Sequence, residues 1–134
     1  MNKSQISFED LQTRIHNFVD KAKEVKQEIQ FNFFVDSDLK DRKFSSIEGM
    51  NIYRTIQEAI HNSIKYAEAK NIDIKVKKLG TQIAIEIKDD GKGFDVAAVA
   101  KGHGLFNMQK RITEINGHFN LQSAASGTEI NILL

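Results

Sequence analysis

The stretch from Ile85 to Met108, IEIKDDGKGFDVAAVAKGHGLFNM, holds four of the eight glycines of this 134-residue chain. Its first residues alternate apolar and polar side chains, which predicts a strand, and DDGKGF follows where that strand should end. Gly91 and Gly93 free the backbone there for conformations closed to other residues. Carboxylates beside such a turn, Asp89 and Asp90, can accept hydrogen bonds from the amino group of a heterocycle. An ordinary acidic turn is the alternative.

The second glycine pair, Gly102 and Gly104, stands directly before a helical pattern that begins at Leu105. Unpaired amides and the positive end of the helix dipole favour an anion at such a helix start. The residues between the two pairs, 94–101 (FDVAAVAK), have mostly small side chains, which is typical of a mobile flap. This half of the stretch therefore suggests an anion site with a movable cover.

Upstream, the longest expected element is a helix from about Ser46 to Ala69. Glu58, Asn62 and Lys65 are spaced four and three residues apart, so they fall within one narrow arc of that helix. A solvated face is the simpler interpretation of this arc. However, Asn is a mediocre helix former, so its mid-helix position hints at a task that needs a short oxygen ligand or an amide donor.

The periodicity of the remaining chain predicts the fold class. Helices are expected over residues 8–25 (with Ser7 as N-cap), 46–69 and 105–115, and strands over residues 29–35, 72–76, 83–88, 118–123 and 128–134, with a polar connection over 36–43. This order predicts an α+β domain with a mostly antiparallel sheet and helices on one face. Since no repeat, proline or low-complexity tract marks a boundary, residues 1–134 are expected to form one domain.

Composition limits the possible partners and chemistry. The 19 basic and 18 acidic residues are interspersed, so no global attraction to nucleic acid or to an anionic membrane is expected. The absence of cysteine excludes disulfides, thiolate zinc sites and thiol catalysis. No apolar run approaches the roughly 20 residues that cross a bilayer, and the first residues lack the pattern of a signal peptide. A cytoplasmic location is therefore expected.

Four motifs, in this order, resemble the nucleotide-binding boxes of the GHKL ATPases, which include gyrase, the large heat-shock chaperone, histidine kinases and MutL. Within residues 47–134, EAIHNSIKYAEA (58–69) resembles the N box, DDGKGF (89–94) and GHGLFNM (102–108) the two glycine boxes, and SGT (126–128) the last box. GHGLFNMQKR and the short lid resemble the sensor histidine kinases of the NarX, DesK and LytS-like groups. The resemblance implies a Bergerat-type two-layer α/β sandwich that binds ATP and Mg²⁺.

The resemblance also implies a role for each matching position near the base. Asp89 matches the aspartate that reads the adenine amino group, and the motif register favours it over Asp90. Gly91 and Gly93 match the wall beneath the base. Thr128 matches the residue that supports the aspartate contact. The first glycine pair is therefore interpreted as a base-binding turn.

Other matching positions concern the metal and the phosphates. Asn62 matches the Mg²⁺ ligand, and Glu58 matches the acid that is associated with the metal or with activation of the attacking group. Positions that match contacts with the phosphates or the adenine are Lys65, Tyr66, Gly102, Gly104 and Leu105. His103, between the two glycines, is a candidate phosphate contact by its position. The second glycine pair is therefore interpreted as a phosphate-binding hinge.

The sequence departs from these kinases in one respect. They carry a phosphoacceptor histidine on a helix of a dimerisation domain, usually followed by an acidic residue, and this sequence contains no such motif. His16 is followed by Asn17 and is interpreted as a surface histidine, and residues 1–27 resemble the segment that links the dimerisation helices to the ATPase core. The chain is thus expected to be the catalytic, ATP-binding domain of a sensor histidine kinase, and to belong to the cytoplasmic portion of that protein. It would be monomeric by itself, turn ATP over slowly, avoid direct membrane contact, and require a separate dimerisation domain and a downstream response regulator.

Two other functions remain open from the sequence. A serine kinase of the anti-sigma-factor type shares the same boxes and acts on a partner protein. A degenerate ATPase-like domain would serve only as a protein-interaction module. Upstream dimerisation helices would separate the first alternative from a histidine kinase, and a nucleotide titration would separate the second.

Overall fold

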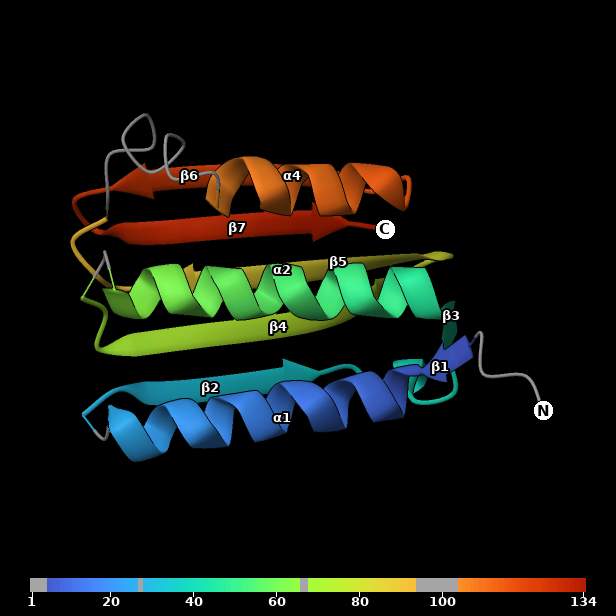
Figure 1. Ribbon diagram of the computed structural model, residues 1–134, viewed down its shortest axis with the longest axis horizontal. Helices are drawn as coiled ribbons and strands as arrows, with labels where there is room; N and C mark the ends of the chain where they lie inside the picture. The colour runs from blue at the N-terminus through green and yellow to red at the C-terminus, as the bar shows by residue number, and fades with distance from the viewer. Residues whose placement is uncertain (1–4, 27, 66–67, 94–103) are drawn as a thin grey trace.

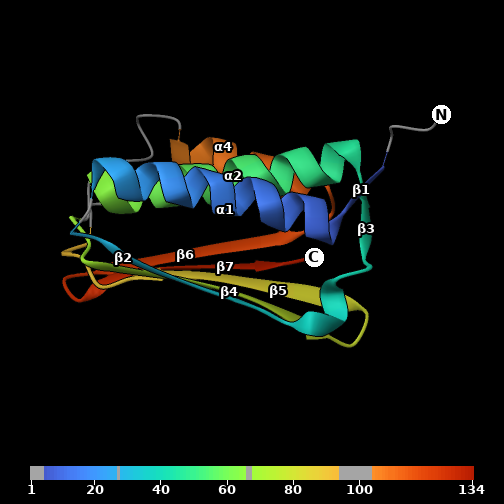
Figure 2. The ribbon, with the colours of Figure 1, turned by 90° about the horizontal axis from the view of Figure 1, so that it is seen from below.

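The computed structural model describes residues 5–26, 28–65, 68–93 and 104–134, which form two layers (Figure 1). One layer is a sheet in the order β2 (Gln30–Val35), β4 (Asn71–Leu79), β5 (Gln82–Asp89), β7 (Gly127–Leu133) and β6 (His118–Ala124). The other layer contains α1 (Phe8–Val25), α2 (Ser46–Lys65) and α4 (Gly104–Glu114), all on one face of the sheet (Figure 2). Strands β2 and β4 are parallel, whereas the other neighbouring pairs are antiparallel. The expected α+β fold, with a mixed and mostly antiparallel sheet, is confirmed.

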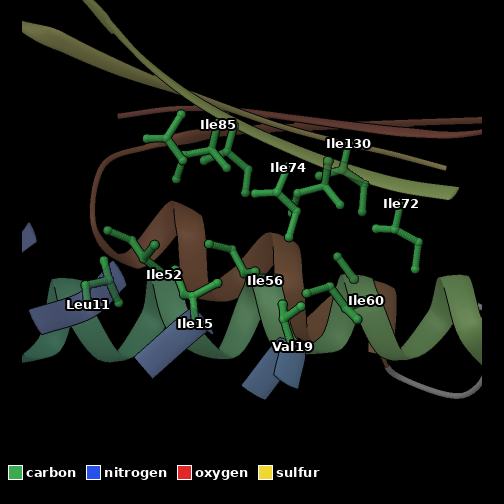
Figure 3. Packing of buried hydrophobic residues seen from close by; sticks show 14 of the residues in the cluster. Leu11, Ile15, Val19, Ile52, Ile56, Ile60, Ile72, Ile74, Ile85 and Ile130 are labelled. Carbon is green, nitrogen blue, oxygen red and sulfur yellow. The ribbon is translucent and has the colours of Figure 1, made fainter. Parts of the chain in front are cut away.

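The core lies between the helices and the inner face of the sheet. Alternate residues of each central strand point inward, as the pleat requires. Figure 3 shows the side chains of the strands meeting those of α1 and α2. The buried residues that it labels are Leu11, Ile15, Val19, Ile52, Ile56, Ile60, Ile72, Ile74, Ile85 and Ile130. Most are isoleucines, whose branched side chains suit a pleated surface, so the helices pack closely against β4, β5 and β7.

Local hydrogen bonds define where α1 and α2 begin. Ser7 caps α1, because its Oγ accepts from the Asp10 N–H at 3.1 Å, as expected. Ser45 and Glu48 form a reciprocal capping box at the start of α2. The Ser45 Oγ accepts from the Glu48 N–H at 3.0 Å, and the Glu48 carboxylate accepts from the Ser45 N–H at 2.7 Å. These caps set the register of the two helices.

The far end of α2 differs from the expectation that it reaches Ala69. The helix is described to Lys65, and residues 68–70 are not helical. Glu68 has a left-handed φ of 53°, and the Ala69 N–H donates to the Ser63 carbonyl oxygen at 3.2 Å. The chain has therefore left the helix before Ala69, which is buried after it.

The sequence did not predict the elements that lie between β2 and α2. The polar connection over residues 36–43 contains a 3₁₀ turn, η1 (Ser37–Leu39), and leads into β3 (Lys43–Ser45), which pairs with β1 (Gln5–Ser7) in a separate two-stranded sheet. Leu39 is buried, but an isolated apolar residue gives no periodic signal, so the sequence did not reveal these short elements.

The apolar stripe of α1 also turns differently from the stripe that the residue spacing predicts, which runs through Phe8, Leu11, Ile15, Phe18, Ala22 and Val25. Val19 is buried and Phe18 only partly so, while Val25 is 78% exposed. Thus the fully buried part of the stripe ends at Val19, and Ala22 in the last turn is only partly buried against the core. Because α1 shares the core with α2, residues 8–19 contribute to this domain whatever precedes them. Among the described residues, no helix is long and apolar enough to cross a membrane.

Candidate functional site

Asp89, the last residue of β5, holds a buried carboxylate with three hydrogen-bond donors around it. Its Oδ1 accepts from the Gly91 N–H at 3.0 Å and from the Thr128 N–H at 3.1 Å, and its Oδ2 accepts from the Ser63 hydroxyl at 2.6 Å. The side chain is only 5% exposed. Hydrogen bonds to a carboxylate are strong, so donors from α2, the glycine turn and β7 fix its position.

Asp90 has a different environment, although it follows Asp89 directly. Its carboxylate is exposed and accepts from the backbone N–H groups of Lys70 and Asn71 at 2.9 and 2.8 Å. The Asn71 side-chain amide donates to its other oxygen at 2.7 Å. The Asn71 side chain, followed by the backbone donors, lowers the pKa of Asp90 from its ordinary value of 3.8. Asp90 therefore ties the start of β4 to the end of β5.

Two glycines allow the backbone around Asp89 to approach closely. Gly93 has a left-handed φ of 73°, and a Cβ at this position would lie 2.1 Å from the Ala124 carbonyl oxygen. A Cβ at Gly127 would lie 2.1 Å from the Asp89 carbonyl oxygen. No side chain fits into either gap. The glycine turn and the β6–β7 turn therefore pack backbone to backbone beside Asp89.

Thr128 lies beside Asp89 on the neighbouring strand, where the two residues are paired in register. Its side chain is buried, and its Oγ1 lies 3.3 Å from the Ser123 Oγ. A hollow of about 210 Å³ touches these residues, but Lys88, Gln122 and Glu129 of the uncovered sheet face also line it. Because the residues that line this hollow include none from α2, it is not the space between α2 and the glycine turn.

On α2, the three residues that the sequence places in one arc of the helix differ in how deeply they are buried. Asn62 is 3% exposed, Glu58 is partly buried and Lys65 is exposed. The interpretation of this arc as a wholly solvated face is therefore wrong for Asn62. Within the described part of the chain, the Asn62 Nδ2 has no hydrogen-bond partner. A buried amide without a partner is costly, and it is the kind of group that a ligand satisfies.

Residues 48–134 match the sequence family described as "Histidine kinase-, DNA gyrase B-, and HSP90-like ATPase". The chain belongs to this ATPase family. An "uncharacterized sensor-like histidine kinase" of Chloroflexus aurantiacus is 36% identical over 103 residues. That alignment covers 71% of this chain but only 17% of the relative, so the chain spans a small part of that protein.

Solved structures share the fold of this ATPase domain. The histidine kinase domain of the Erythrobacter litoralis EL346 blue-light activated histidine kinase has a TM-score of 0.81 at 14% identity, over 100% of this chain and 69% of that one. The mycobacterial sensor histidine kinase MprB has a TM-score of 0.76 at 14% identity, over 97% of this chain and 95% of that one. The catalytic domain of the histidine kinase ThkA has a TM-score of 0.76 at 16% identity, over 100% of this chain and 97% of that one. These matches confirm the two-layer sandwich expected from the motifs, while the subgroup within the kinases stays a prediction.

The side chains of Asn62 and Glu58 suit a Mg²⁺ ion that a nucleotide also coordinates. Magnesium prefers oxygen ligands and usually takes only one or two from protein when phosphates supply others. Asn62 offers a buried amide, and rotation of that amide exchanges its nitrogen and oxygen. Glu58 lies one turn earlier on α2. Since the described residues contain no group of three or more His, Asp or Glu suited to a metal, a site made by protein alone is not found there.

The remaining expected positions of the ATPase domain fall into two groups. Gly104 begins α4, and Leu105 in its first turn is partly buried against the core. Tyr66, Gly102 and His103 lie outside the described residues. Among the other histidines, His16 is exposed, in agreement with a surface role, and its ring centroid lies 4.5 Å from that of Phe33.

Ser63 is the residue near Asp89 that motif matching did not single out. It is 4% exposed and donates directly to the Asp89 carboxylate. A serine in mid-helix is a weak sequence signal, because it often bonds to its own helix backbone. Its position next to Asn62 was the only available hint.

Proposed function

We propose that this chain is the ATP-binding catalytic domain of a sensor histidine kinase. It binds Mg-ATP and transfers the γ-phosphate to a histidine on a dimerisation domain of the full-length protein. The observation that carries the proposal is the Asp89 carboxylate, buried and oriented by Gly91, Thr128 and Ser63 beside a glycine turn. Family membership makes ATP the expected ligand, and the sensor-like relative favours a histidine kinase over a serine kinase.

At the base end, Asp89 accepts a hydrogen bond from the adenine amino group. An ionised carboxylate supplies only acceptors, which match an amino group and oppose a keto oxygen in the same place. Gly91 and Gly93 leave the backbone bare beneath the ring. Thr128 supports the contact, because its N–H holds the Asp89 Oδ1.

At the phosphate end, α4 begins at Gly104, and the first N–H groups of a helix, which have no partner within the helix, favour an anion. The hinge at Gly102, His103, Gly104 and Leu105, with Lys65 and Tyr66, completes the proposed set of phosphate and adenine contacts. Asn62 and Glu58 would hold the metal from α2. When bound, Mg²⁺ neutralises charge on the phosphate oxygens.

Positioning and charge neutralisation carry most of a phosphoryl transfer, so the domain alone should bind ATP but hydrolyse it slowly. The acceptor histidine attacks in line from the dimerisation domain, and residues 1–27 connect to that domain. A response regulator then takes the phosphate. As part of a sensor kinase, the domain works in the cytoplasm, is monomeric when isolated, and contacts neither nucleic acid nor membrane.

A calorimetric titration with ATP tests the proposal, with and without Mg²⁺. We expect binding that Mg²⁺ strengthens, with turnover too slow to distort the titration. No Mg²⁺-dependent binding at millimolar ATP would contradict it, and would favour an interaction module instead.

A further inference from the structure

The hydroxyl of Ser63 makes a contact that is unusual for a buried hydroxyl in a helix. It donates to the Asp89 Oδ2 at 2.6 Å, within the short range of a hydroxyl bonded to a carboxylate. Thr55 on the same helix shows the common alternative. Its buried Oγ1 donates to the Asn51 carbonyl oxygen one turn earlier, at 2.7 Å. Ser63 thus links α2 to the end of β5, whereas Thr55 bonds within α2.

The Ser63 contact completes the restraint on Asp89. Backbone donors from Gly91 and Thr128 both bind Oδ1, which leaves Oδ2 to Ser63. Without the hydroxyl, the described contacts would hold the carboxylate by one oxygen only. Rotation about the bond to the carboxyl group would then be less restricted, since this torsion is broad in aspartate.

The direction of the same hydrogen bond also sets the polarity of the site. A serine hydroxyl has a single hydrogen, and here that hydrogen points to Asp89. What remains on the Ser63 Oγ and on the Asp89 Oδ2 are lone pairs, which only accept. A ligand that donates an N–H is favoured at this point, and a ligand that presents a keto oxygen meets two acceptors.

We propose that Ser63 is a positioning residue that fixes Asp89 and thereby sets the preference of this site for a purine bearing an amino group. The inference rests on the proposed function, because it requires Asp89 to contact the base. Ser63 acts through the Asp89 carboxylate and through the direction of its own hydrogen bond.

The experiment compares ATP with purine riboside triphosphate, which has the same ring and phosphates but no amino group. Dissociation constants are measured by calorimetry for the wild-type chain, Ser63→Ala and Thr55→Val. We expect Ser63→Ala to weaken ATP binding about tenfold, the scale of one hydrogen bond to a charged group, and to leave the analogue unchanged. Thr55→Val removes a buried hydroxyl from the same helix without touching Asp89, so both affinities should stay as in the wild type.

Three outcomes overturn the inference or separate it from the proposed function. If Ser63→Ala weakens ATP and the analogue equally, Ser63 is only structural. If the wild type prefers ATP and Ser63→Ala keeps that preference, the inference fails while the proposed function stands. If the wild type binds no ATP, the proposed function itself fails.

A second variant guards against misfolding of the first. Ser63→Cys preserves the packing but replaces a strong donor with a weak one. The preference for ATP should then fall between those of the wild type and Ser63→Ala. A wild-type preference in both variants overturns the inference.

Discussion

Asp89 and Asp90 are adjacent in sequence, yet their carboxylates bind different parts of the fold. Asp89 is buried and receives donors from α2, β7 and the glycine turn. Asp90 is exposed and receives donors from Lys70 and Asn71 at the start of β4. The two carboxylates therefore have different tasks, because one belongs to the candidate site and the other ties the start of β4 to the end of β5.

The role of Asp90 predicts a pH-dependent loss of stability in Asp90→Ala. Removing a carboxylate that accepts three hydrogen bonds at the surface should lower the free energy of unfolding by about 1 to 2 kcal/mol at pH 7. The pKa of Asp90 is lowered in the folded state, so its contribution is complete above the unfolded pKa and is lost as the pH falls through the folded pKa.

Urea denaturation at pH 7, 5 and 3 measures this effect. The difference between wild type and Asp90→Ala should be the same at pH 7 and 5 and smaller at pH 3. A difference that grows on acidification would contradict the assigned role.

Gly93→Ala should be more damaging than Gly80→Ala. Both glycines have a left-handed φ, of 73° and 63°, but a Cβ at Gly93 would collide with the Ala124 carbonyl oxygen while no atom lies within 4 Å at Gly80. We expect a loss of about 1 kcal/mol for Gly80→Ala from backbone strain alone, and at least about 2 kcal/mol for Gly93→Ala. Thermal unfolding compares the two, and equal losses would show that the turn at Gly93 relaxes freely.

Asn62→Ala should remove the effect of Mg²⁺ on ATP binding. Wild-type affinity is expected to rise with the metal, and the variant should bind with the lower, metal-free affinity under both conditions. Asn120→Ala makes the same substitution at an exposed position on strand β6 and serves as the control. If Asn62→Ala weakens ATP binding equally with and without Mg²⁺, Asn62 does not bind the metal.

Ile15→Ala tests whether α1 is part of the folded domain. Ile15 is buried in the shared core, so the truncation should lower the free energy of unfolding by about 2 to 4 kcal/mol. Val25→Ala on the same helix, at an exposed position, should change it by less than about 0.5 kcal/mol. Chemical denaturation distinguishes the two. A negligible loss for Ile15→Ala would mean that α1 is a separable linker.

Much of this fold was predictable because its signals are periodic. The alternation of Ile83, Ile85 and Ile87 predicts a strand whose inward face continues to Asp89. The turn residues around Gly80 predict the hairpin that joins β4 to β5. Val19 was missed because a three- or four-residue step fits Phe18 as well as Val19. The choice between them depends on the rotation of α1 against the sheet.

The other misses depend on contacts between distant residues. The pairing of Ile6 with Phe44 joins short segments that have no pattern of their own. Ser63 meets Asp89 across 26 positions of sequence, and only the docking of α2 on β5 brings them together. The burial of Asn62 has the same origin. The motifs predict a set of site residues, but only the tertiary packing reveals which of them orient one another.

The most direct test of the central claim is the ATP affinity of Asp89→Asn, compared with that of Asp73→Asn. Asp73 lies on β4, where its carboxylate accepts from the Asn32 side chain at 2.7 Å, so its substitution removes the same charge away from the site. We predict that Asp89→Asn weakens ATP binding by about 1.5 to 3 kcal/mol, the scale of a charged hydrogen bond, while Asp73→Asn leaves it unchanged. Wild-type affinity in a folded Asp89→Asn variant would contradict the account.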